Sequence, residues 1–238
     1  MQNPSIIIGS QFNGPKNSSN GGYACGRVAE FIDGTARVRL RIPPPLDVRF
    51  QVRETLDGVI VVDGDQVVAE AWPTEFDVDV PAPPTAQEAE LASKDYIGFK
   101  SHRFVSCFVC GVDRKPGDGM RIYAGPVPGR NVVACTWTPD RGLSADGDNV
   151  DTVYLWGALD CPGGFSFPHP ESGTILLGEL SVKVLEPVPV GARYVVIGWE
   201  LEHEGRRHRT GTALFSESGT CHGVGLGVWF EVPDLETS

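Results

Sequence analysis

The cysteine pair Cys107 and Cys110 is the feature of the sequence with the most evident chemistry. A C-x-x-C spacing is typical of zinc ligands and of redox-active thiols. A tetrahedral zinc site needs two more ligands, and the candidates, Cys221-His222 and His102, are single positions rather than a second spaced pair. Structural, zinc-binding and redox roles therefore stay open, and we expect buried structural thiols and no metal.

Other catalytic motifs are missing from the sequence. It contains no phosphate-binding G-x-x-x-x-G-K-[ST] loop, and no G-x-G-x-x-G follows a strand into a helix. No G-x-S-x-G surrounds Ser18 or Ser19, which argues against a serine nucleophile. The basic cluster at 206–209 could contact the phosphates of coenzyme A, or it could be a solvated turn. We expect no bound cofactor.

Composition and charge exclude several classes of function. The chain has 238 residues and a net charge of −11, so an acidic surface would repel nucleic acid. With 41% hydrophobic residues it can bury a sizeable core, and its apolar runs are too short for a membrane span. The first fourteen residues show no secretory signal, so we expect a cytoplasmic protein with reduced thiols.

Strands are the main elements available to position any site. Alternation of apolar and polar residues, or long β-type runs between turn dipeptides such as Asp63-Gly64 and Glu204-Gly205, predicts strands with one buried face. The expected strands are 36–42, 48–52, 76–80, 175–185, 193–202, 207–215 and 224–232. The glycine-rich run at 223–227 lies inside such a pattern, which indicates a bulge or a close approach of another segment.

Three segments carry helical signals. Residues 20–32 follow a plausible N-cap at Asn20, and residues 151–160 follow Asp151 in the same way. A third helix is expected at 85–94, after the proline-rich stretch 81–84.

The two halves of the chain correspond loosely. Each has a small-residue helix, then an alternating strand that ends in a Pro-x-Pro turn, RVRLRIPPPL at 37–46 and SVKVLEPVPV at 181–190. Strands joined by turn dipeptides follow in both halves. This pattern predicts an α+β protein in which residues 1–84 and 101–238 each wrap an antiparallel sheet around a helix, with a linker at 85–100.

Two short segments, CFVCG at 107–111 and PGDGMRI at 116–122, resemble the "CFxCG…NPxGLxL" opening of hotdog-fold thioesterases of the phenylacetyl-CoA thioesterase type. That family begins its central helix with His-Gly-Gly and has an acidic residue nine positions after the His. Here the first helix begins Asn20-Gly21-Gly22 and has Ala29 at the acidic position, whereas the second carries Asp160 there. The family pattern is thus divided between the two helices.

The resemblance implies a tandem hotdog with one composite site between its halves. In the family, an amide at the start of one helix polarises the thioester carbonyl, and a carboxylate of the other helix acts on water or the acyl carbon. Carried over, Gly22 or Gly21 would supply the amide and Asp160 the carboxylate, with Asn20 able to bond substrate or water. The acyl group would lie against Gly21, Tyr23, Trp156 and Phe165.

Physical chemistry supports such a pair and also offers simpler interpretations. A helix N-terminus has free N–H donors and partial positive charge, and a carboxylate can act as base or nucleophile. Equally, Asp160 could face water, Gly21-Gly22 could form a tight turn, and Asn20 could be a plain N-cap. Glu30 lies one residue out of register with the family and is expected to face solvent.

We therefore predict hydrolysis of an acyl- or aroyl-CoA thioester, or of an acyl carrier conjugate, in a cleft between the halves. The alternative is a non-catalytic acyl-CoA or small-ligand binder, which Asn20 in place of His and Ala29 in place of the acid favour. A dehydratase or hydratase is disfavoured because neither helix contains His, and a structural β scaffold is the remaining class. The acyl group and a homodimer stay open.

Overall fold

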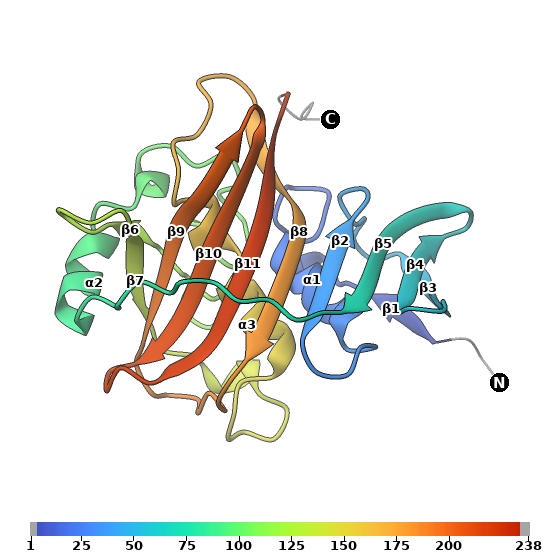
Figure 1. Ribbon diagram of the computed structural model, residues 1–238, viewed down its shortest axis with the longest axis horizontal. Coiled ribbons are helices and arrows are strands. Elements are labelled where there is room, and N and C mark those ends of the chain that lie inside the picture. Colours follow the sequence, from blue (N-terminus) through green and yellow to red (C-terminus); the bar gives the residue numbers. More distant parts are fainter. Residues whose placement is uncertain (1–3, 234–238) are drawn as a thin grey trace.

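The computed structural model describes residues 4–233. Its framework is an eleven-stranded antiparallel sheet with the order β1-β3-β4-β5-β2-β8-β11-β10-β9-β7-β6. Helices α1 and α3 lie behind this sheet in the view of Figure 1, and an extended segment crosses its front. Within residues 4–233, every helix is too short or too polar to cross a bilayer.

The first part of the chain supplies one end of the sheet. Its elements are β1 (Ser5–Ile7), the 3-10 turn η1 (Ser10–Phe12), α1 (Gly21–Ala29), β2 (Ala36–Leu40), β3 (Arg49–Glu54), β4 (Val59–Asp63) and β5 (Gln66–Pro73). Helix α2 (Ala86–Ser93) and the turn η2 (Ile97–Phe99) follow.

The second part supplies the longer strands. Its elements are β6 (Gly125–Pro126), β7 (Val133–Trp137), η3 (Arg141–Leu143), α3 (Thr152–Ala158), α4 (Cys161–Gly164), β8 (Thr174–Val184), β9 (Tyr194–Glu204), β10 (Arg207–Ser216) and β11 (Cys221–Val232). The three predicted helices are thus confirmed with shorter bounds, and the second breaks at Asp160, just before Pro162.

The strand order is the same in both parts of the chain. In the sheet, the first set is ordered β1-β3-β4-β5-β2 and the second β7-β9-β10-β11-β8. In both sets the second strand along the chain lies at the far end from the first, and a helix follows the first strand. The antiparallel pair β2–β8 joins the sets, with Ala36 opposite Val182 and Arg39 opposite Glu179. Arg37 and Arg39 both bond the Glu179 carboxylate, at 2.8 and 2.9 Å, which adds charge pairing to this seam.

Glycines on α1 allow the two central helices to touch. A Cβ on Gly26 would lie 2.9 Å from the carbonyl oxygen of Val153 and 3.0 Å from Cβ of Trp156. A Cβ on Gly22 would overlap the side chain of Asp160 and the backbone of Trp156. Because helix spacing is limited by such side chains, the i, i+4 glycines set how closely α1 approaches α3.

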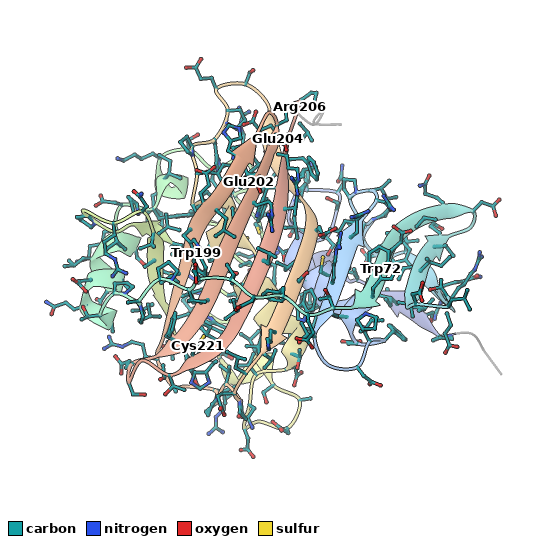
Figure 2. All side chains as sticks on the ribbon, viewed as in Figure 1. Trp72, Trp199, Glu202, Glu204, Arg206 and Cys221 are labelled. Atoms are coloured by element: carbon teal, nitrogen blue, oxygen red, sulfur yellow. The ribbon has the colours of Figure 1, made fainter. Side chains whose placement is uncertain are left out.

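The predicted strand at 76–80 is wrong, although its alternation is real. Phe76, Val78 and Val80 pack on a cluster of buried side chains that includes Trp199 and Phe215, so the segment lies across the sheet face instead of joining a ladder. Figure 2 shows Trp199 beside this crossing segment. One side of an extended chain that rests on a surface is buried at every second residue, which reproduces the pattern of a strand.

Helix α2 follows directly after the crossing segment. Thr85 and Glu88 form a capping box, in which the Thr85 side chain accepts from the Glu88 N–H and the Glu88 carboxylate accepts from the Thr85 N–H. Ala89 and Ala92 of this helix are buried in the same cluster as the crossing segment. The linker therefore covers apolar surface of the sheet as well as connecting its two parts.

The close helix contact predicts a large effect of one methyl group. Gly26→Ala should lower the free energy of unfolding by about 1–3 kcal/mol, because backbone and Trp156 would have to move. Gly9→Ala is the matched control, since a Cβ there meets no atom within 4 Å. Urea denaturation of both variants checks this, and equal stability of Gly26→Ala and wild type would contradict the packing.

Candidate active site

Strands of the sheet contact the chain where α3 ends and α4 begins. Thr212 Oγ1 donates to the Leu159 carbonyl oxygen at 2.7 Å. A Cβ on Gly225 would lie 3.2 Å from Leu159, and one on Gly198 would overlap the Pro162 carbonyl. The glycine-rich run at 223–227 therefore accommodates Leu159 on one side of Asp160, and Gly198 of β9 accommodates Pro162 on the other.

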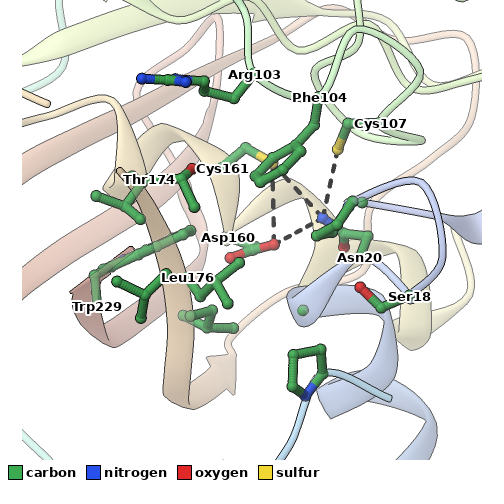
Figure 3. Close-up of a pocket in the computed structure, with 18 of the residues that line it drawn as sticks. Ser18, Asn20, Arg103, Phe104, Cys107, Asp160, Cys161, Thr174, Leu176 and Trp229 are labelled. Carbon is green, nitrogen blue, oxygen red and sulfur yellow. Dashed lines mark hydrogen bonds between the residues drawn. The ribbon is translucent and has the colours of Figure 1, made fainter. Parts of the chain in front are cut away.

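Asp160 points from this break to the N-terminus of α1. Its Oδ2 accepts from the Gly22 backbone N–H at 2.9 Å and from Asn20 Nδ2 at 2.9 Å. The residue is only 2% exposed, and its Oδ1 has no hydrogen-bond partner among residues 4–233. Figure 3 shows the carboxylate between Asn20 and the cavity wall formed by Leu176. One oxygen is anchored, and the other is buried without a hydrogen-bond partner among the described residues.

Asn20 joins helix capping to this site. Its Oδ1 accepts from the Tyr23 N–H at 2.8 Å, as an N-cap does. Its Nδ2 donates to Asp160 and also lies 3.8 Å from Cys107 Sγ and 3.7 Å from Cys161 Sγ. Asn20 therefore both caps helix α1 and makes a polar contact with the site.

The environment of Asp160 opposes its ionisation. Burial raises the pKa of its carboxyl to about 7, while the Gly22 N–H and the Asn20 amide act in the opposite direction. The partial positive charge of the α1 N-terminus favours the anion as well. The burial contribution is the larger one, which is typical of carboxyl groups in functional sites.

Gly21 offers a second backbone donor next to the carboxylate. It lines the cavity, and its N–H has no acceptor among the residues that the structure describes. Since the Gly22 N–H is already bonded to Asp160, Gly21 is the amide of this helix start that remains free for a ligand oxygen.

An apolar cavity of about 300 Å³ opens onto these groups. Asn20, Gly21, Asp160 and Phe165 of the predicted set line it. Its walls come from both parts of the chain, and the apolar side chains include Leu40, Ile42, Phe104, Ile175, Leu176, Leu177 and Trp229. A carboxyl group and a free amide on the wall of such a pocket suit an apolar chain that ends in a carbonyl group.

Tyr23 and Trp156 do not line this cavity, contrary to the sequence prediction. The Tyr23 ring stacks on Phe12, with ring centroids 4.0 Å apart, and Trp156 is buried in the α1–α3 contact at Gly26. Each residue turns a helix by about 100°, so side chains near a site residue in sequence can face away from it. The β8 residues that form the wall instead gave no distinguishing signal.

The structure brings a third cysteine to the C-x-x-C pair. The Sγ atoms of Cys107, Cys110 and Cys161 all lie within 4.8 Å of one another and line the cavity. Donation from the other two thiols holds the pKa of Cys107 well below its usual range. His222, one of the additional zinc ligands considered from the sequence, does not belong to this cluster. Strand β11 carries it elsewhere, and its Nδ1 bonds the Pro187 carbonyl oxygen.

The remaining candidates lie outside the cavity. Arg207 and Arg209 are paired with Glu204 and Glu202 at 3.9 and 3.0 Å, so the basic cluster is neutralised by its own hairpin. Figure 2 shows Glu202, Glu204 and Arg206 together at this end of the sheet. Glu30 is exposed and pairs with Arg27 at 3.1 Å, as expected for a solvent-facing residue.

Comparisons with solved structures identify the fold. The chain is similar to the TesB protein of Mycobacterium avium subspecies paratuberculosis, with a TM-score of 0.58, 13% identity, and coverage of 92% of this chain and 89% of that one. An acyl-CoA thioesterase II of Mycobacterium marinum gives a TM-score of 0.56 and 11% identity, over 96% and 92% of the two chains.

A third neighbour is a conserved protein of unknown function with a hot dog fold from Alicyclobacillus acidocaldarius. It matches with a TM-score of 0.52 and 10% identity, over 97% of this chain and 93% of that one. These three structures show that the chain has the α+β hot dog fold. No protein-family model matches the sequence. No curated protein matches it either.

Two substitutions of Asn20 separate its capping role from its contact with Asp160. Asn20→Ser keeps a capping oxygen and should cost about 1 kcal/mol of stability. Asn20→Asp also keeps the cap but places a second carboxylate against Asp160, so we expect at least about 1 kcal/mol more destabilisation at neutral pH. Thermal denaturation of both variants tests this, and equal effects would argue against the contact.

Proposed function

We propose that this protein hydrolyses the thioester of an acyl- or aroyl-CoA, or of an acyl carrier conjugate. We further propose that residues 1–84 and 101–238 are two hot dog units, joined by the linker 85–100, that share one composite site. The repeated strand order, with a helix in each set, supports the two-unit division.

One observation carries the proposal. A buried carboxylate from the end of one central helix meets the amide-rich start of the other, on the wall of an apolar cavity. An acyl chain would fill the cavity, and its carbonyl group would reach the polar end. The acyl-CoA thioesterase of Mycobacterium marinum has the same fold, which supports this class of reaction.

The residues have separate roles in the proposed reaction. The Gly21 N–H donates to the thioester carbonyl oxygen, where negative charge develops as the carbonyl carbon is attacked. The free Oδ1 of Asp160 accepts a proton from a water molecule, and the water oxygen forms the new bond to the acyl carbon. The carbon–sulfur bond then breaks, and the proton passes to the departing thiolate.

Asn20 and Gly22 position this carboxylate. They hold Oδ2 from two directions and leave Oδ1 without a partner among the described residues, so Oδ1 is the oxygen assigned to the reactant in this proposal. A fixed base needs little reorganisation when the reaction begins. The Gly22 contact also favours a second candidate, a non-catalytic acyl-CoA binder, because the amide equivalent to the family's polarising donor is already occupied.

Thioester hydrolysis over a panel of short, long and aromatic acyl-CoAs tests the proposal. Loss of thioester absorbance is the suitable signal, because the chain's six cysteines would react with a thiol dye. Asp160→Asn should lower kcat about 100-fold or more, since it removes the base but keeps an acceptor for Gly22.

Asp151→Asn is the matched control, because this carboxylate flanks the opposite end of α3 and does not line the cavity. It should keep wild-type turnover. Full activity in Asp160→Asn would remove the assignment of the base. Binding of acyl-CoA without hydrolysis by any variant, including wild type, would establish the binding protein instead.

A further inference from the structure

We propose that Cys107, Cys110 and Cys161 bind a single Zn²⁺ ion at the wall of the cavity. The two halves of the chain contribute Asn20 on one side and the three cysteines on the other. The proposal does not depend on thioester hydrolysis, because it concerns a ligand of the resting protein.

The spacing of the sulfur atoms suits one ion. All three Sγ atoms lie within 4.8 Å of one another. Thiolates bound to tetrahedral zinc at about 2.3 Å are about 3.8 Å apart, so small side-chain rotations would close the site. So compact a group favours a single ion over a multi-iron cluster. Soft thiolate ligands select zinc over calcium or magnesium.

The backbone of the turn that carries Cys107 and Cys110 is tightly closed. The Gly111 N–H donates to the Cys107 carbonyl oxygen at 2.9 Å, and a Cβ on Gly111 would lie 2.5 Å from the backbone of Cys107. This closed turn holds the two sulfur atoms near each other.

A side-chain donor from the other part of the chain lies beside two of the three sulfur atoms. Asn20 Nδ2 lies 3.8 Å from Cys107 Sγ and 3.7 Å from Cys161 Sγ. Figure 3 shows this amide between the two sulfur atoms and Asp160. An amide N–H cannot ligate zinc, but it can hydrogen-bond two ligands and fix their positions. The arrangement therefore includes both ligands and supporting donors.

The site would have an open position and a structural role. All three cysteines line the cavity, so an ion has a route of entry and a fourth position that faces the cavity. The ion would tie the segment that carries Phe104, a cavity wall residue, to the chain beside Asp160. It would thus fix the wall relative to the carboxylate.

Metal analysis of the full chain tests this inference. Protein purified with a phosphine reductant and without chelators should contain about one zinc per chain. Titration with a mercurial thiol reagent should release that zinc to a colorimetric indicator. Replacement by Co²⁺ should give a sulfur-to-cobalt charge-transfer band in the near ultraviolet, a readout that is independent of any activity.

Cys161→Ala and Cys135→Ala form a matched pair, because both remove a buried thiol and only Cys161 belongs to the cluster. Cys161→Ala should lose the zinc and weaken the cobalt band, whereas Cys135→Ala should keep both. A chelator should lower the Tm of wild type and leave Cys161→Ala unchanged. Wild type without zinc that gives no cobalt band would overturn the proposal, and so would stoichiometric copper in place of zinc.

Discussion

The hydrogen bond between Asp160 Oδ2 and the Gly22 N–H is the contact on which the site depends. It joins residues 138 positions apart in the chain and brings the end of one central helix to the start of the other. It requires glycine at position 22, a break after α3, and a sheet surface without side chains beneath that break. Packing of helices and strands therefore serves to place one carboxylate.

This arrangement is costly for stability. A buried carboxylate loses its hydration, and one oxygen of Asp160 has no partner among the described residues to replace it. A polar group held at this cost on a cavity wall is a candidate for a functional role rather than a contribution to fold stability.

Sequence patterns predicted the elements well because their signals are local. N-caps and alternation located the helices at 21–29 and 152–158 and the long strands. The division of the family motif between Gly22 and Asp160 also indicated which residues meet.

Non-local features were not predictable in this way. The facing of Tyr23 depends on the phase of a helix, and the proximity of Cys161 to Cys107 depends on how separate segments pack. The segment 76–80 shows a related limit, since alternation reports contact with a surface but not with which surface.

Asn20 explains how the carboxylate and the sulfur cluster coexist. Its Oδ1 caps α1, and its Nδ2 contacts Asp160, Cys107 and Cys161. A histidine, which the resembled family has here, could itself ligate a metal or carry a positive charge beside Asp160. The asparagine amide contacts both the carboxyl group and the sulfur atoms without doing either. The departure from the family pattern at this position is therefore consistent with a site that combines a fixed carboxyl group with a cluster of three cysteines.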